Sequence, residues 1–251
     1  MNKLPVSVYI ICQNESKHIQ RVLKNVEDFD EVIIVDSGST DDTLEIAKEF
    51  TENIYYQPWL GFAKQKEYAK SLCTNEWVLN LDADEEITQT LKEEIKKAIE
   101  ENSIDALDIR RNCKYLDKFD HPWLKFNRRI RFFRKSKGFY PPKLVHESIV
   151  VKGKIKKAKG FILDHGTFDL ETHLHKINEY SSLRAEEKSK QKRKASLLKL
   201  LTIFPVAFLK SYILKRGFFN GIRGFIAGIN NAYYAFLKEA KLYEKNSIKK
   251  F

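Results

Sequence analysis

The chain has 251 residues, 43% of them hydrophobic, which suits one large domain, or a domain with an appendage, around a core. Its net charge of +11 is uneven, because Asp and Glu are frequent in the first hundred residues and Lys and Arg gather later. This skew indicates an anionic partner such as nucleic acid, an anionic membrane or a phosphorylated acceptor.

Composition also predicts the compartment. The three cysteines, Cys12, Cys73 and Cys113, are an odd number without a pairing pattern, which favours a reducing environment. The N-terminus lacks the apolar segment of a signal peptide, and no uninterrupted apolar run reaches the roughly 18–20 residues of a membrane-spanning helix. We therefore expect a protein that is made and kept in the cytoplasm.

The first hundred residues alternate between strand and helix patterns. Apolar runs predict strands over 6–12, 31–36, 53–56 and 76–81, and helical spacing predicts helices over 15–26, 41–50, 61–72 and from about 87. Such alternation is typical of βαβ units, so the predicted fold is α/β with a mostly parallel sheet flanked by helices.

The pattern changes twice after residue 100. Strand patterns at 104–110, 129–133 and 144–151 precede a helical pattern from residue 169 to about 192, after which no strand is predicted. We expect a domain over 1–168, with a nucleotide-binding part (1–100) and a substrate-facing part (101–168). A helical C-terminal region (169–251) follows.

The segment from Trp77 to Glu86 carries the clearest chemical pattern. A buried strand leads into Asp82 and Asp84, and ligands bind at this end of strands in α/β sheets. Two close carboxylates repel unless a cation or ligand hydroxyls compensate, and Mg²⁺ prefers oxygen ligands. The pattern indicates a metal-bound phosphorylated ligand. The alternative is that these acids only cap the helix that follows.

Two other predicted strands end in polar residues. Gln13 and Glu15 follow the first strand and Asp36 ends the second, so all three strand ends place polar groups on one edge, as a nucleotide site needs. The residues after Asp36 also suit a turn and a helix cap. Neither a dinucleotide-binding nor a P-loop glycine motif is present.

These motifs together resemble family 2 glycosyltransferases of the GT-A (Rossmann-like) fold. The resemblance is carried by Gln13 to Glu15, Val35 to Thr43 and Leu81 to Glu85. The segment from Gly61 to Lys66, followed by the strand at Trp77, is most similar to bacterial lipopolysaccharide-core glucosyltransferases. The resemblance to family 2 glycosyltransferases covers nearly the whole chain and is strongest over residues 5–90.

The resemblance implies roles for individual residues. Asp36 would contact the base, Asp82 the ribose, and Asp84 a Mg²⁺ or Mn²⁺ ion that bridges the diphosphate. The other implied nucleotide-sugar contacts are Ile11, Gln13, Glu15, Lys66 and Ala83. Many relatives carry an aromatic residue where this chain has Gln13, which puts base stacking there in doubt. His165, before the C-terminal helix, is implied to reach the metal or diphosphate, or else lies near the helix cap.

The acceptor side is predicted from the same resemblance. An inverting transfer needs a general base, and the match is Glu147, with His146 beside it to orient the base or touch the acceptor. Alternatively, Glu147 is a surface residue on an alternating strand. Arg131 belongs to a group of arginines that either grip an acidic acceptor or form a solvated face.

The C-terminal region has two apolar stretches, at 197–214 and 217–237, with Lys and Arg around both. This composition matches amphipathic helices that lie in a membrane interface. An ordinary helix pair on the catalytic domain, or a dimer face, would give the same pattern. We expect a peripheral protein at the cytoplasmic face of the inner membrane, of unknown oligomeric state.

The predicted function is inverting, metal-dependent transfer of a hexose, with glucose from UDP-glucose preferred, to a lipid-linked saccharide such as the heptose of a lipopolysaccharide inner core. The first alternative is a sugar-phosphate nucleotidyltransferase, although residues 10–17 lack the glycine of its usual phosphate loop. The second is a basic nucleic-acid or membrane-binding module without catalysis. No recognised nucleic-acid motif supports it, so we expect no nucleic-acid partner.

Overall fold

The computed structural model describes residues 3–141, 149–166 and 170–248. The chain forms two compact units. One consists of residues 1–113 and 127–166, and the other of residues 114–126 and 167–251. The main division lies close to the predicted end of the first domain at 168. The segment 114–126, which we call the excursion, leaves the first unit and belongs to the second. The sequence analysis did not predict this.

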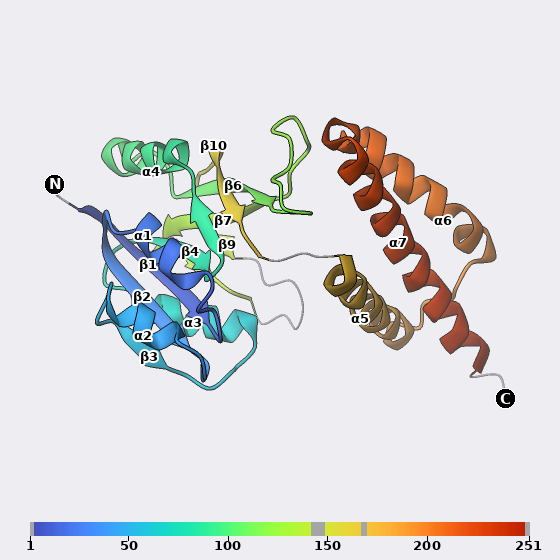
Figure 1. The fold of residues 1–251 in the computed structure, drawn as a ribbon, viewed down its shortest axis with the longest axis horizontal. Helices are drawn as coiled ribbons and strands as arrows, with labels where there is room; N and C mark the ends of the chain where they lie inside the picture. Colours follow the sequence, from blue (N-terminus) through green and yellow to red (C-terminus); the bar gives the residue numbers. More distant parts are fainter. Residues whose placement is uncertain (1–2, 142–148, 167–169, 249–251) are drawn as a thin grey trace. The chain divides into compact units, whose positions relative to one another are not determined.

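The first half of the sheet unit contains the predicted βαβ units (Figure 1). Strands β1 (Leu4–Cys12), β2 (Phe29–Asp36), β3 (Ile54–Tyr56) and β4 (Trp77–Asp82) are parallel, in the order β3-β2-β1-β4. The connecting helices are α1 (Ile19–Asn25), α2 (Thr43–Lys48) and α3 (Phe62–Leu72). Each predicted strand is present, because these near-continuous apolar runs are covered on both faces.

The second half of the sheet is mixed. Helix α4 (Gln89–Glu101) follows the short strand β5 (Glu85–Ile87), and β6 (Ala106–Cys113) and β7 (Arg128–Arg134) come next. With β10 (Ile155–Asp164), the eight strands have the order β3-β2-β1-β4-β7-β6-β10-β5, and β7 is antiparallel to both neighbours. A turn of 3₁₀-helix, η1 (Lys135–Lys137), leads to a separate pair, β8 (Gly138–Phe139) and β9 (Val150–Val151).

Two strands of the eight-stranded sheet were not predicted from the sequence. Strand β10 (Ile155–Asp164) was missed, because its first half carries three lysines and contains Gly160, so it does not have the pattern of an apolar strand. Strand β5 was missed because its two glutamates suggested a helix start. Of the strand predicted over 144–151, residues 144–148 lie outside the described residues.

Side chains alternate between the two faces of the sheet, and each face has its own core. Val8, Ile10 and Leu79 pack on the face covered by α1 and α4, whereas Tyr9 and Val78 face the side of α3. All five are fully buried. Burial of such side chains stabilises the fold by about 1.5–3 kcal/mol each. This two-sided core fixes the strand ends that carry the polar motifs.

The second unit is helical. It contains α5 (Leu170–Lys190), α6 (Leu197–Leu209), the five-residue π-helix η2 (Lys210–Leu214), the 3₁₀-helix η3 (Gly217–Asn220) and α7 (Ile222–Ile248). Excursion 114–126 is bound to these helices through backbone groups. Arg223 donates to the carbonyls of Tyr115 (3.0 Å) and Lys118 (2.8 Å), and the Asn220 side chain accepts from the amide of His121 at 2.8 Å.

One described segment, Leu197–Leu214, is a helix long and apolar enough to cross a membrane by length and composition, with a mean hydropathy of 1.7. This result differs from the sequence analysis, which required an uninterrupted apolar run and found Lys199 and Lys210 inside the segment. Within the described helical unit, neither α6 nor η2 has a buried side chain. The apolar side chains of α6 and η2 are therefore exposed or only partly buried.

Candidate active site

The candidate site lies at the carboxyl ends of β1, β2 and β4. In the parallel register, Ile11 pairs with Asp82, and Cys12 pairs with Asp36, so the predicted residues of three strands meet at one edge. The chain runs from β1 to β2 and β3 on one side and places β4 on the other side. This reversal is the topological switch point at which α/β sheets bind ligands.

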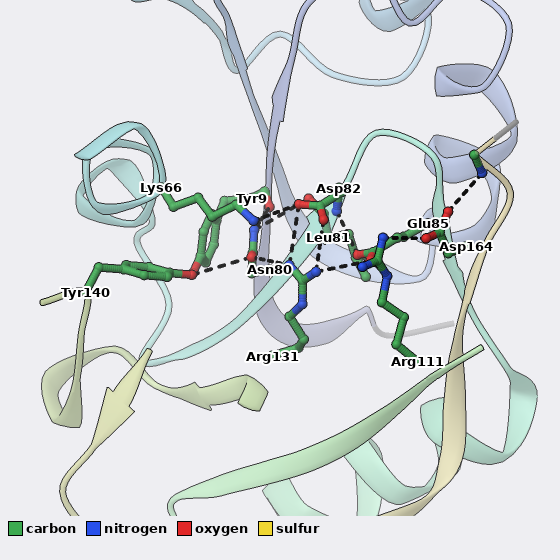
Figure 2. A network of polar contacts seen from close by, with 11 residues as sticks. Tyr9, Lys66, Asn80, Leu81, Asp82, Glu85, Arg111, Arg131, Tyr140 and Asp164 are labelled. Atoms are coloured by element: carbon green, nitrogen blue, oxygen red, sulfur yellow. Dashed lines mark hydrogen bonds and ion pairs between the residues drawn. The ribbon is translucent and has the colours of Figure 1, made fainter. Parts of the chain in front are cut away.

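Asp82 is held by two buried cations (Figure 2). The Nζ atom of Lys66 lies 2.8 Å from Asp82 Oδ1, and Arg131 Nη2 lies 2.9 Å from Asp82 Oδ2. Burial acts to raise the pKa of Asp82, but the charges of Arg131 and Lys66 outweigh it and hold the pKa well below its usual value. Asp82 is therefore an ionised acceptor of hydrogen bonds.

The ion pairs continue along the sheet through Glu85, which is fully buried. Glu85 Oε1 lies 3.1 Å from Arg131 and 2.9 Å from Arg111, and Glu85 Oε2 accepts the Asp82 amide at 3.0 Å. Arg111 also pairs with the buried Asp164, which accepts the Gly166 amide at 2.9 Å. Arg131 on β7 and Arg111 on β6 thus connect these strands with β4, β5 and β10 (Figure 2).

The other end of this network reaches β1. Asn80 Oδ1 accepts from Arg131 at 2.6 Å and from the Tyr140 hydroxyl at 3.4 Å, and the Tyr140 and Tyr9 hydroxyls are 2.7 Å apart (Figure 2). The sequence analysis missed Asn80, although an amide within an otherwise apolar strand is a usable signal, since buried polar groups are hydrogen-bonded.

Arg131, the predicted acceptor contact, lies inside this network. Only 6% of the residue is exposed, and its guanidinium is engaged by Asn80, Asp82 and Glu85. Arg131 therefore positions Asp82 and lies within the sheet. The arginine-rich segment around it suggested a surface because strand β7 was read without its neighbours.

The pKa of Asp84 is shifted in the opposite direction from that of Asp82. It is half-buried, and burial together with four neighbouring carboxylates raises its pKa to about 7. These neighbours are, in order of effect, Asp164, Glu85, Asp82 and Glu15. The interpretation of Asp84 as a helix cap does not fit, since α4 begins at Gln89 with Thr88 in the cap position. Asp84 instead lies where negative charge accumulates.

A divalent cation fits this position. Across the described ranges, no group of three or more His, Cys, Asp or Glu side chains has the arrangement of a metal site. Mg²⁺ does not need such a group, because it is often bound by one or two carboxylates and completes its shell with water and substrate phosphates. Asp84 would hold the ion, and a cation would relieve the repulsion that raises its pKa.

His165, the other predicted metal ligand, is placed beside Asp84 by its backbone. Its amide donates to the Asp84 carbonyl at 2.9 Å, whereas its ring Nε2 lies 3.1 Å from Glu86 Oε2. The structure therefore brings the residue to the site and gives its ring a carboxylate partner. Its role toward a metal remains a prediction.

Asp36, the predicted base contact, has partners in the turn that follows it. It is 2% exposed, and its carboxylate accepts the amides of Gly38 (2.8 Å) and Ser39 (2.9 Å), the Ser39 hydroxyl and the Cys12 thiol. These bonds close the turn after β2, so Asp36 shapes the edge and has little surface left for a ligand.

The remaining predicted residues are distributed as follows. Gln13 is exposed and Glu15 half-buried after β1, whereas Ile11 and Ala83 are buried. The Glu15 amide donates to Thr43 Oγ1 at 2.7 Å, which joins the loops after β1 and β2. Glu147 and His146 lie outside the described residues.

Replacement of Arg131 by Met tests the network. Because Glu85 and Asp82 would each lose a buried partner, the free energy of unfolding should fall by about 3–5 kcal/mol in urea denaturation. Lys97→Met, on the exposed surface of α4, is the control and should change it by less than about 0.5 kcal/mol. An Arg131→Met loss as small as that of the control would contradict the assignment.

Replacement of Asp84 by Asn tests the electrostatic strain. A raised pKa of about 7 means that Asp84 stabilises the folded state less as the pH rises from about 4 to 7. Asp84→Asn should therefore be more stable than the parent by about 1–2 kcal/mol at pH 8 in EDTA, and nearly equal at pH 4.5. The control is Asp117→Asn, at a site 97% exposed, which should give no pH-dependent difference. If Asp84→Asn is less stable than the parent at pH 8, the unfavourable electrostatic environment of Asp84 is refuted.

Comparison with known proteins shows the family to which the chain belongs. Residues 7–152 match the family described as Glycosyl transferase family 2. The lipopolysaccharide core biosynthesis glycosyltransferase LpsC of Rhizobium meliloti (strain 1021) is 32% identical over 98% of this chain and 95% of its own length. An uncharacterised glycosyltransferase of Rickettsia typhi is 36% identical over 95% of this chain and 87% of its own.

Solved structures give the same fold. TarS 1-349 of S. aureus, in complex with UDP-GlcNAc, has a TM-score of 0.51 at 15% identity, and covers 98% of this chain and 92% of its own. This confirms the predicted GT-A sheet with its C-terminal helices. The match of more than half the chain to one family, with near full-length relatives, leads to one conclusion: the protein is a member of glycosyl transferase family 2.

Proposed function

We propose that the protein is a metal-dependent, inverting hexosyltransferase that uses a nucleoside-diphosphate sugar, with UDP-glucose preferred. The observation that carries the proposal is the pairing of two unlike carboxylates at the switch point. Asp82 is kept ionised by Lys66 and Arg131, and Asp84 lies in a field that favours a cation. Such a pair suits a ribose hydroxyl next to a metal-bound diphosphate.

The residues would divide the reaction between them. A metal ion at Asp84 would supply charge neutralisation for the departing nucleoside diphosphate. Asp82 would accept hydrogen bonds from the ribose, and Lys66 would lie close enough to share its charge with the diphosphate. Glu147 would take the proton of the acceptor hydroxyl as the oxygen attacks the anomeric carbon from the face opposite the leaving group, in a single displacement.

The acceptor is proposed to be a lipid-linked saccharide, such as the heptose of a lipopolysaccharide inner core. Support comes from the name of the relative LpsC and from the charge of the helical unit. Residues 188–238 contain eleven of the 45 basic residues and none of the 34 acidic ones, so the rest of the chain is electrically balanced. An anionic membrane surface fits this segment.

Exposed apolar side chains accompany these charges. Leu198 and Leu201 on α6 are 73% and 77% exposed. An apolar helix with basic flanks lies in the membrane interface, where burial of carbon and attraction to anionic lipids add. We propose peripheral attachment at the cytoplasmic face of the membrane that holds the acceptor.

Isothermal titration with UDP-glucose tests the donor site. At pH 8, where Asp84 is ionised, binding should require Mg²⁺ or Mn²⁺, and Asp84→Ala should weaken it by about tenfold or more, equivalent to about 1.4 kcal/mol. Asp117→Ala, on the exposed surface, should bind like the parent. Equal binding in EDTA would refute the metal, and a preference for a nucleoside triphosphate would favour the nucleotidyltransferase alternative.

Flotation with lipid vesicles tests the membrane surface. The full chain should float with vesicles rich in phosphatidylglycerol, less with phosphatidylcholine alone, and less at high salt. The variant Leu198→Glu/Leu201→Glu should float several-fold less, since it charges the exposed face of α6 without touching a buried residue.

The control for flotation is Ile155→Glu, an exposed apolar position in the sheet unit. It should float like the parent. A parent protein that does not float, but forms a dimer that the α6 variant disrupts in light scattering, would assign the helix to a dimer face.

A further inference from the structure

The structure leaves open which residues hold the base of a nucleotide donor. The carboxylate of Asp36, expected to contact the base, is engaged in its own turn. Gln13, which directly follows β1, is exposed, and its side-chain amide has no aromatic ring on which a base could stack. A base in water is held mainly by stacking on apolar or aromatic surface, so another part of this edge must supply that surface.

The segment from Tyr56 to Phe62, between β3 and α3, has the required surface, and we name it the aromatic loop. Four of its seven residues are large, apolar and exposed: Tyr56 (68%), Trp59 (49%), Leu60 (45%) and Phe62 (56%). The Trp59 and Phe62 rings meet edge to face at 4.7 Å. Exposed apolar side chains gathered in one short segment are a candidate binding surface.

The aromatic loop is held in place by one buried side chain. Gln65, with no exposed surface, donates through Nε2 to Ser37 Oγ and to the Gln57 carbonyl, both at 3.0 Å. Its Oε1 accepts the Leu60 amide at 3.2 Å. Gly61 allows the sharp turn, with a φ of +87°. The exposed rings are therefore preorganised, which lowers the entropy cost of binding a ligand.

The same contacts connect the loop with the donor site. Ser37, which Gln65 holds, directly follows Asp36, and the Gln57 amide donates to the Asp36 carbonyl at 2.9 Å. Tyr56 is paired with Asp36 in the parallel register of β2 and β3. On α3, Lys66 follows Gln65 and reaches Asp82. One helical turn thus positions both the loop and the carboxylate proposed for the ribose.

We infer that the aromatic loop is the stacking platform for the nucleobase of the donor, with Tyr56 and Trp59 as its principal rings and Phe62 as support for Trp59. The inference rests on the proposed nucleotide-sugar donor and adds the residues that bind its base. The base would lie at the β2–β3 side of the edge, and the diphosphate at Asp84 on the β4 side.

Calorimetric titration of the full chain with UDP and Mg²⁺ tests the inference. Tyr56→Ala/Trp59→Ala should raise the Kd for UDP by about tenfold or more, and Trp59→Phe, which keeps a ring, by much less. Mg²⁺–pyrophosphate, which has no base, should bind the double variant and the parent equally. Trp123→Ala, which removes an exposed tryptophan (62%) from the helical unit, is the matched control and should leave both affinities unchanged.

The outcomes separate this inference from the function on which it rests. If the parent binds UDP and the double variant binds it with the same Kd, the platform is refuted while the donor site stands. A variant that loses pyrophosphate as much as UDP also refutes it, because the loop would then support the whole site and not the base. If the parent itself binds no UDP, the proposed donor fails first, and the inference fails with it.

Discussion

The pairing of the buried Arg131 and the half-buried Arg111 with three carboxylates is the interaction on which the site depends. Arg131 and Arg111 neutralise Asp82, Glu85 and Asp164, which come from β4, β5 and β10. In a low-dielectric interior, none of these charges is tolerable without its partners. The pairing therefore fixes the order of the strands around the site as well as the direction of the Asp82 carboxylate (Figure 2).

The network explains why two aspartates only one residue apart behave differently. Lys66 and Arg131 occupy both oxygens of Asp82, and neither cation reaches Asp84 within the ion pairs of the described residues. Asp84 meets the surplus of negative charge instead, and its pKa rises to about 7. Active sites commonly keep such unfavourable charge because a substrate or metal relieves it. The strain is thus consistent with a site that is completed by its ligand.

The two units differ in how they distribute apolar and charged side chains. The sheet unit buries its apolar residues on both faces and displays polar groups at one edge. The helical unit leaves α6 exposed and concentrates the excess positive charge of the chain in residues 188–238. The exposed rings of the aromatic loop belong to the first pattern, since a buried amide holds them at the polar edge. Exposed apolar surface in both units underlies the two binding surfaces that we propose.

The sequence by itself determined the parallel strands, their common polar edge and the Asp-x-Asp site, because strand periodicity and strand ends are local properties. Only the tertiary structure decided what the charged residues do. Arg111 and Asp164 are 53 residues apart in the chain, and Arg131 and Glu85 are 46 apart, so no local pattern pairs them. The same holds for Asp36, whose turn engages it, and for β10, which is a strand through its neighbours β6 and β5 and not through its lysine-rich sequence. Partners across a sheet are set by strand order, and strand order is a property of the whole chain.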